Sequence, residues 1–217
     1  MILYGSSLSP FVRKVLAFAA EKGIEIELKP TGDVPGQPGP EFLAASPLRK
    51  MPALVDGDFA LPDSSAIVQY LEALQPEPNL IPTEPRARGR TIWFEEYADS
   101  VLMACGGKMF FNRVVAPRFL GRPGDAAVAD AAERDELPPI LDYLESAIPD
   151  SGFLVEDRLT LADIAVASPL ANLPYMASGV DPQRYPRLAR YVDAILGRPS
   201  FAAWIARERA LLAKLAA

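Results

Sequence analysis

A proline-rich segment divides the chain into two parts with different patterns. Residues 75–85 hold four prolines in eleven positions. Prolines at this density oppose both helices and central strands, so we place a linker at 76–86. Residues 1–75 alternate between strand-like and helix-like patterns, whereas residues 87–217 contain helix-like patterns and no clear strand pattern. The sequence therefore predicts two domains, an α+β domain followed by an all-α domain.

The first 29 residues have the pattern of a strand, a helix and a second strand. Residues 1–4 are apolar enough for a short strand, Ser9-Pro10 is typical of a helix start, and Gly23 of a helix end. Residues 24–28 alternate between apolar and charged side chains, which predicts a half-buried strand. Short links between these elements favour parallel pairing of the two strands through a right-handed crossover.

The rest of the first domain follows a proline- and glycine-rich loop at 30–40. One helical turn is expected at 41–45. Asp56-Gly57 lies between apolar segments, which predicts a hairpin with a type I′ turn. An amphipathic helix from Ser64 completes the order βαβ-α-ββα.

Helical periodicity dominates the second part. It predicts helices at 92–115, 126–147, 160–173, 186–196 and 201–215. The pair Pro138-Pro139 is expected to kink or restart the second of these helices.

Composition excludes several kinds of chemistry. Histidine is absent and Cys105 is the only cysteine, so His-based triads, His-ligated zinc, intramolecular disulfides and Cys-x-x-Cys pairs are excluded. A formal net charge of −6 argues against a nucleic-acid partner. The apolar runs are shorter than the ~20 residues that a bilayer crossing requires, and the first residues lack a basic leader. We therefore expect a cytoplasmic protein with no membrane partner.

Ser9 lies where an α/β sheet usually binds ligands, between the first strand and the first helix. The unpaired N–H groups at a helix start favour an anion, and a hydroxyl there can lower the pKa of a bound thiol. The alternative reading is that Ser9 is only a helix cap.

Three further segments carry polar groups at element boundaries. Met51-Pro52 precedes a hairpin strand. Its peptide bond is either cis, which exposes the Met51 backbone for strand-like pairing with a peptide, or simply the start of the strand. Asp63-Ser64 is either a helix cap or a site for an ammonium and a carboxylate. Thr160-x-x-Asp163 predicts a capping box that serves stability.

In this order and with these gaps, the four segments resemble the cytosolic glutathione transferase superfamily over essentially the whole chain. The resemblance implies a thioredoxin-like N-terminal domain that binds glutathione as a co-substrate, and a helical C-terminal domain that supplies most of the electrophile pocket. It further implies a homodimer. The implied activity joins the glutathione thiolate to a small hydrophobic electrophile, with peroxidase or dehalogenase reactions as side activities.

The resemblance also implies roles for individual residues. Ser9-Pro10-Phe11 is similar to the Ser-Pro-Phe of tau-class enzymes, in which the serine activates the glutathione sulfur; zeta and theta enzymes use a serine nearby. This serine-type, bacterial-like assignment makes Ser9 the catalytic residue, with Ser7 as the second candidate. Phe11 is assigned to the glutathione site beside it.

The other glutathione contacts implied by the resemblance come from two segments. Met51-Pro52 is similar to the family's Val/Ile followed by cis-proline, which pairs with the cysteinyl unit, and Lys50 is the expected partner of the glycine carboxylate. Asp63-Ser64 stands where the family has Glu/Gln-Ser for the γ-glutamyl end. Asp63 is one methylene shorter than the usual Glu, and Ser46 replaces a usual Asn.

Two alternatives remain beside the transferase. One is a noncatalytic ligand-binding or scaffold protein, and the other is a glutathione-dependent thiol reductase, which needs a cysteine where Ser9 stands. Cys105 is expected to be a buried small hydrophobe. Candidates for the electrophile pocket are Tyr97, Met103, Cys105, Phe110, Phe111 and Arg113.

Overall fold

The computed structural model describes residues 1–33 and 37–215. Residues 34–36 of the expected loop at 30–40 lie outside this part. The chain divides into two compact units, Met1–Leu80 and Ile81–Ala217, which we describe in turn.

The first unit contains a four-stranded mixed sheet in the order β2-β1-β3-β4. Strand β1 (Ile2–Tyr4) is parallel to β2 (Glu27–Lys29) and antiparallel to β3 (Ala53–Asp56), which forms a hairpin with β4 (Phe59–Pro62). This sheet confirms the expected thioredoxin-like α+β fold of the first unit.

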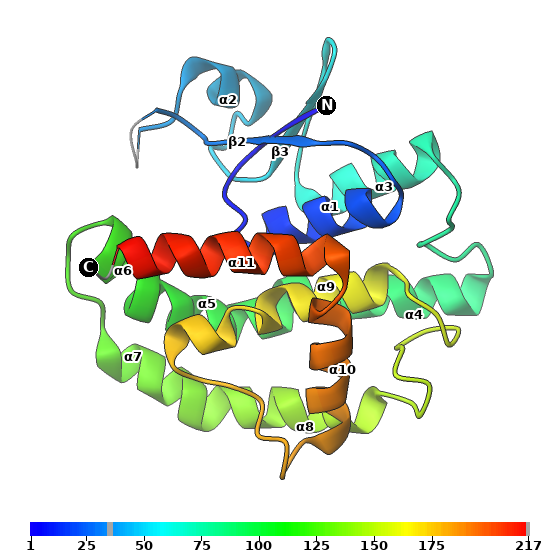
Figure 1. The fold of residues 1–217 in the computed structure, drawn as a ribbon, viewed down its shortest axis with the longest axis vertical. Helices are drawn as coiled ribbons and strands as arrows, with labels where there is room; N and C mark the ends of the chain where they lie inside the picture. The colour runs from blue at the N-terminus through cyan, green and yellow to red at the C-terminus, as the bar shows by residue number, and fades with distance from the viewer. Residues whose placement is uncertain (34–36, 216–217) are drawn as a thin grey trace. The chain divides into compact units, whose positions relative to one another are not determined.

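Helices cover both faces of the sheet, because successive side chains of its central strands point to opposite faces. Helices α1 (Pro10–Glu21) and α3 (Ser64–Leu74) lie side by side, and α2 (Pro40–Ala45) lies on the other side of the strands (Figure 1). Tyr4 and Ala53 form a core cluster with Phe42 and Ala45 of α2. Their neighbours along the strands, Leu3 and Leu54, are fully buried.

Two details of this unit differ from the sequence-based expectation. Strand β2 covers Glu27–Lys29 rather than 24–28, because it pairs with only the three residues of β1. In the hairpin, Asp56 pairs with Phe59, so Gly57 and Asp58 form the turn and only Gly57 has a positive φ, 61°. A type I′ turn needs positive φ at both central residues, so the predicted turn type is wrong.

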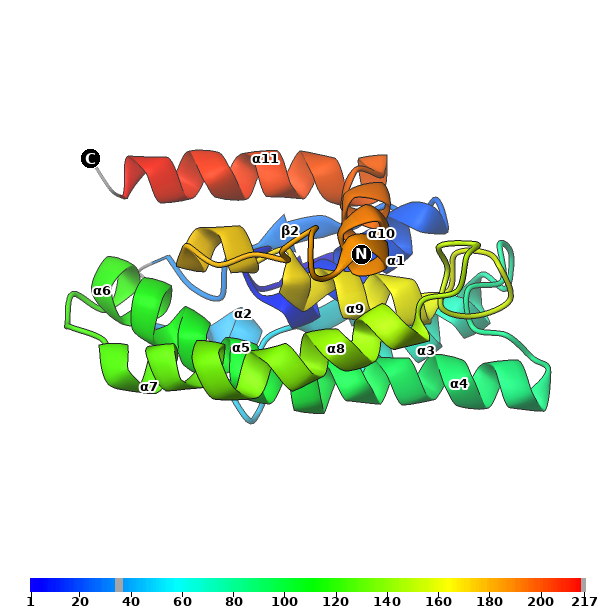
Figure 2. The same ribbon diagram turned by 90° about the horizontal axis from the view of Figure 1, so that it is seen from below.

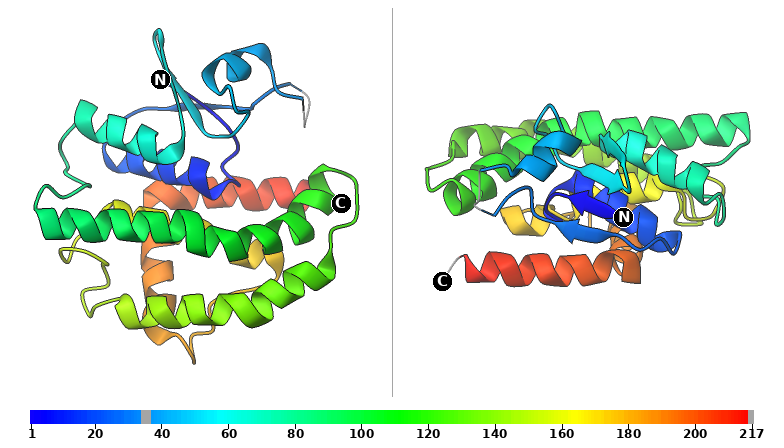
Figure 3. Two further views of the ribbon diagram at one scale, coloured as in Figure 1. Left: turned by 180° about the vertical axis from the view of Figure 1, so that it is seen from behind. Right: turned by 90° about the horizontal axis from the view of Figure 1, so that it is seen from above.

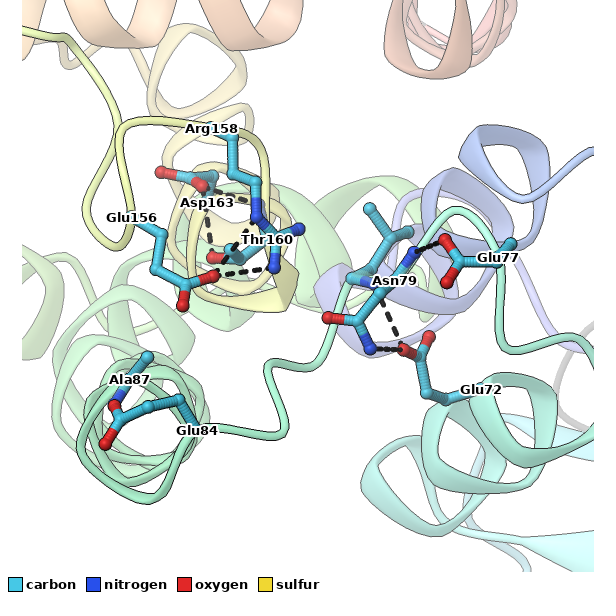
Figure 4. Close-up of polar contacts among 10 residues, drawn as sticks. Glu72, Glu77, Asn79, Glu84, Ala87, Glu156, Arg158, Thr160 and Asp163 are labelled. Atoms are coloured by element: carbon cyan, nitrogen blue, oxygen red, sulfur yellow. Dashed lines mark hydrogen bonds and ion pairs between the residues drawn. The ribbon is translucent and has the colours of Figure 1, made fainter.

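Hydrogen bonds and an ion pair attach the segment after α3 to the first unit. The ammonium group of buried Lys22 donates to Glu72 Oε2 and to the carbonyl oxygen of Pro78, both at 2.7 Å. Glu72 Oε1 accepts hydrogen bonds from Asn79 Nδ2 and from the amide of Leu80 (Figure 4). One carboxylate therefore holds both α1 and the proline-rich segment.

The second unit begins with a long helical run. This run comprises α4 (Pro85–Glu96), the π-helical η1 (Tyr97–Leu102), α5 (Met103–Phe110), the π-helical η2 (Phe111–Val115) and α6 (Ala116–Phe119). The run starts seven residues before the predicted helix at 92–115, because Pro85 fits the first helical position and the Glu84 carboxylate accepts the amide of Ala87.

A second run lies beside the first within this unit (Figures 2 and 3). It comprises α7 (Ala126–Ala131), the π-helical η3 (Ala132–Glu136) and α8 (Leu137–Ala147). The new helix at Leu137 places the first proline of Pro138-Pro139 next to its start, where a missing amide costs little. The expected helix at 126–147 is thus divided just before this proline pair by a π-helical segment, but the helical run does not end there.

The last elements are α9 (Leu161–Leu170), the 3₁₀ turn η4 (Leu173–Met176), α10 (Pro186–Leu196) and α11 (Pro199–Lys214). All ten residues of α9 are buried. The predicted capping box is present: Asp163 Oδ2 accepts the amide of Thr160 at 2.9 Å, and Oδ1 accepts the amide of Leu154 at 2.9 Å. Burial raises the pKa of Asp163 to about 6.

No helix among the described residues is both long enough and apolar enough to cross a membrane.

Candidate functional site

One cavity of the first unit collects the residues that the sequence motifs single out. Its volume is about 360 Å³. Segments far apart in the sequence line it, from the start of α1, the loop between α2 and β3, the end of β4 and the start of α3. The lining residues are Phe11, Ser46, Leu48, Lys50, Met51, Pro52, Pro62, Asp63 and Ser64. All six predicted glutathione-contacting residues are among them.

Ser9 stands at the cap position of α1, but its side chain does not cap the helix. The Ser9 carbonyl oxygen accepts the amide of Arg13 at 2.9 Å, while its hydroxyl makes no capping hydrogen bond. Ser9 is partly exposed and lies two residues before Phe11, outside the set that lines the cavity. Ser7, the second candidate, is also partly exposed and outside that set. Ser9 is thus the N-cap residue of α1 without a capping hydrogen bond from its side chain, and its role at a bound thiol stays a prediction.

The loop that carries Lys50 and Met51 is closed by Ser46. The Ser46 hydroxyl donates to the carbonyl oxygen of Lys50 at 2.7 Å and accepts the Lys50 amide at 3.1 Å. Arg49, between them, has a left-handed φ of 58° and donates its amide to the carbonyl oxygen of Ser46. Ser46 is fully buried. Its side chain thus fixes the backbone just before the Met51-Pro52 bond.

The Met51-Pro52 peptide bond is cis, as the resemblance implies. Pro52 is buried, while the side chains of Lys50 and Met51 are exposed. Two exposed residues, one of them basic, therefore line the cavity next to the cis bond.

The sequence motifs missed the structural role of Ser46. The available signal was a short hydroxyl side chain at the end of a helical turn, since such residues hydrogen-bond to nearby backbone groups.

Asp63 caps α3 in this structure. Its Oδ1 accepts the amides of Ser65 and Ala66 at 2.9 and 3.1 Å. The residue is exposed, has a positive φ of 78° and lines the cavity next to buried Ser64. The structure confirms that Asp63 caps α3, and its contact with a ligand stays a prediction. Because the capped helix start faces the cavity, its N–H groups also favour an anion there.

Two candidates for the electrophile pocket belong to the core of the second unit. Tyr97 donates to the carbonyl oxygen of Ile140 at 3.2 Å, and its ring lies 4.9 Å from that of Tyr143. Burial raises the pKa of Tyr97 to about 12. Cys105 is 1% exposed, and burial raises the pKa of its thiol to about 11. The expectation of a buried Cys105 is confirmed, and neither side chain is accessible to a substrate.

The other four candidates are at least partly exposed. They are Met103, Phe110, Phe111 and Arg113. Arg113 is held within the second unit by ion pairs to Asp130 and Glu133, each at 2.7 Å, and by a bond to the carbonyl oxygen of Met176. Its guanidinium therefore serves the structure of this unit.

Comparisons with known proteins point to one family. Residues 3–79 match the profile of the glutathione S-transferase N-terminal domain, and residues 121–208 match that of the glutathione S-transferase C-terminal domain.

Individual proteins resemble the chain over nearly its whole length. Glutathione S-transferase 3 of Zea mays is 32% identical over 92% of this chain and 90% of its own. The uncharacterized GST-like protein YibF of Escherichia coli is 32% identical over 93% and 96%. A structure of human glutathione transferase theta-2, complexed with glutathione and an unknown ligand, has a TM-score of 0.84 and 28% identity over 99% of this chain and 90% of that one.

Proposed function

Because the chain belongs to the glutathione S-transferase family, we propose that it binds glutathione in the cavity of its first unit and transfers it to a small hydrophobic electrophile. The observation that carries this proposal is that all six residues expected to contact glutathione line one cavity of about 360 Å³. Three separate segments of the chain supply that lining.

The cavity offers groups that match the ends of glutathione. Lys50 supplies an ammonium group for the glycine carboxylate, and the Met51 backbone supplies strand-like hydrogen bonds for the cysteinyl unit. Asp63 accepts from the γ-glutamyl ammonium, while the Ser64 hydroxyl and the start of α3 receive its carboxylate. Phe11 packs against the bound tripeptide.

In the proposed reaction, the glutathione thiol loses its proton to solvent and the Ser9 hydroxyl donates a hydrogen bond to the thiolate. Stabilising the thiolate lowers the pKa of the thiol, so a larger fraction is reactive at neutral pH. The sulfur electron pair then forms a bond to an electrophilic carbon, and the leaving group departs with its bonding pair. This assigns the protein to the serine-type transferases.

We also propose that the protein works as a homodimer. Leu48, which lines the cavity, has 81% of its surface exposed, and Trp93 in the second unit has 53%. A second copy that covers such side chains removes them from water, and two-fold symmetric pairs are the commonest oligomers. Sedimentation should give about twice the 23.5 kDa of one chain; a single-chain mass at micromolar concentration would contradict the dimer.

One observation favours a second function, a noncatalytic glutathione-binding protein. Ser9 lies outside the residues that line the cavity, and such a protein would bind glutathione without a hydroxyl at the sulfur. The thiol-reductase alternative has no comparable support, because Cys105 is buried and lies in the second unit.

The two functions differ in turnover. A titration of glutathione measures binding, and the conjugation of glutathione to 1-chloro-2,4-dinitrobenzene measures catalysis. Saturable binding with a rate above the uncatalysed reaction supports the transferase. Binding with no rate enhancement, across a small panel of electrophiles and hydroperoxides, supports the noncatalytic protein.

A further inference from the structure

A hollow of about 520 Å³ in the second unit carries an unusual concentration of positive charge. Arg187, Arg190 and Arg198 line it. Among the described residues of its lining, Asp150 is the only acid, although acids outnumber bases 28 to 22 in the whole chain. The hollow is therefore basic in an acidic protein.

The helix α10 explains why Arg187 and Arg190 face the same side. Residues 187, 190 and 194 follow one another at intervals of three and four, which places them on one face of α10, and Arg198 follows just after this helix ends, at the cap position of α11. The loop after α8 forms the opposite wall with Asp150, Ser151 and Phe153. The hollow thus combines guanidinium groups, a hydroxyl and an aromatic ring.

Arg187 is held in place within this hollow. Its Nη2 lies 3.2 Å from Asp150 Oδ1, and its Nη1 donates to the carbonyl oxygen of Ile148 at 3.5 Å. The Asp150 side chain is 94% exposed, so water screens this pair strongly. The exposed carboxylate of Asp150 therefore compensates little of the positive charge on Arg187.

Arg190 is exposed, and no residue within 1–33 and 37–215 forms a hydrogen bond or an ion pair with its side chain. Its guanidinium keeps all its donors available for a ligand.

The start of α10 does not account for this positive charge. The Glu145 carboxylate already accepts the amides of Arg187 and Leu188, at 2.8 to 3.1 Å. The helix N-terminus is therefore neutralised from α8, and the charge in the hollow comes from side chains.

We propose that this hollow binds a small organic ligand with two or more negative charges, such as a phosphate ester or a polycarboxylate. Guanidinium groups bind phosphate and carboxylate oxygens through paired, charge-assisted hydrogen bonds. A volume of about 520 Å³ also leaves room for an apolar portion beside Phe153. The site is separate from the proposed glutathione cavity, which belongs to the first unit.

Calorimetric titration at constant ionic strength tests the proposal on the full chain. Pyrophosphate and citrate are the two probes, and acetate is the singly charged control. We expect saturable binding of at least one probe and none of acetate. Pyrophosphate binding alone identifies the phosphate class, and citrate binding alone the polycarboxylate class.

The variant Arg190→Gln should lower the affinity for the probe at least about 10-fold, because a charge-assisted hydrogen bond is lost. The matched control is Arg184→Gln, which removes an exposed arginine just before α10 that pairs with Asp142 outside the hollow. It should leave affinity within about twofold. Glutathione binding should be unchanged in both variants. Absence of probe binding to the wild-type protein, or equal losses in the two variants, would overturn the proposal.

Discussion

The hydroxyl group of Ser46 makes hydrogen bonds with both backbone groups of Lys50, at 2.7 Å to the carbonyl oxygen and 3.1 Å from the amide. This contact closes a five-residue loop directly before the Met51-Pro52 bond. Lys50 and Met51 both line the cavity. A buried hydroxyl thus positions two groups that the proposed function uses.

Replacing this hydroxyl should therefore affect both stability and binding. Ser46→Ala leaves the Lys50 backbone without its partner, so we expect a loss of about 1 to 3 kcal/mol in the free energy of unfolding and weaker glutathione binding. Denaturant unfolding and calorimetry measure the two effects. Ser146→Ala is the control, because that exposed hydroxyl bonds to a backbone carbonyl far from the cavity in sequence. Unchanged affinity in Ser46→Ala would show that the loop holds its shape without Ser46.

A substitution of Asp63 can distinguish its role as a helix cap from its proposed role as a ligand contact. Asn caps a helix about as well as Asp and tolerates a positive φ, so Asp63→Asn should leave stability almost unchanged. A charge-assisted bond to the γ-glutamyl ammonium is worth about 1.5 to 3 kcal/mol, so its loss should weaken glutathione binding about 10- to 100-fold. Calorimetric titration together with a melting curve distinguishes the two. Wild-type affinity in this variant would leave Asp63 a structural cap only.

Asp163 should make the stability of the protein depend on pH. Burial raises its pKa from 3.8 to about 6 in the folded state. Because the folded protein binds this proton more tightly than the unfolded chain does, the protonated carboxyl group contributes to stability. The contribution is complete below pH 3.8 and disappears as the pH rises through 6. At 1.36 kcal/mol per unit, the change is about 3 kcal/mol.

The comparison with Asp163→Asn isolates this effect from other acids. Urea unfolding of both proteins between pH 4 and pH 7 should show the wild type losing stability relative to the variant as the pH rises, with no further relative change above about pH 7. A constant difference across this range would mean that the pKa of Asp163 is not raised.

Cys105 should be unreactive in the folded protein. Burial raises its pKa to about 11, and its thiol lies 3.5 Å from the carbonyl oxygen of Ala132. Only thiolates react quickly with disulfide reagents. A thiol assay at pH 8 should therefore find no rapid reaction in native protein and one reactive thiol after denaturation. Rapid labelling of native protein would reveal an accessible Cys105.

The first unit could be predicted closely because its signals are local. Ser9-Pro10 and Gly23 mark the ends of α1, and Ser64 begins α3 as expected. The hairpin turn could not be predicted in detail, since its type depends on which residues pair across the strands. Asp56 pairs with Phe59 and moves the turn one residue along.

In the second unit, the boundaries were harder to predict than the helices. Pro85 looks like part of a linker, although it also fits the first position of α4. The π-helical segments such as η1 have no compositional signature, because they arise from a shift in backbone hydrogen bonding. Expected helix 92–115 is therefore interrupted twice.

The candidate site was predictable only as a set. No single motif predicts that Phe11, Lys50 and Ser64 lie in one site. Only the order of motifs that the chain shares with the family predicts it. The contact between Ser46 and Lys50 was not predictable, because it depends on the loop conformation around Arg49.

The effect of Ser9→Ala on conjugation tests the central claim most directly. The Ser9 hydroxyl is not used for capping, so its removal should leave the fold and glutathione binding nearly intact. The rate of conjugation to 1-chloro-2,4-dinitrobenzene should fall at least ~10-fold, because one positioned hydrogen bond to the thiolate is lost. Ser7→Ala, measured beside it, should keep most of the activity. Full activity in Ser9→Ala, with the loss appearing in Ser7→Ala instead, would contradict the assignment of Ser9.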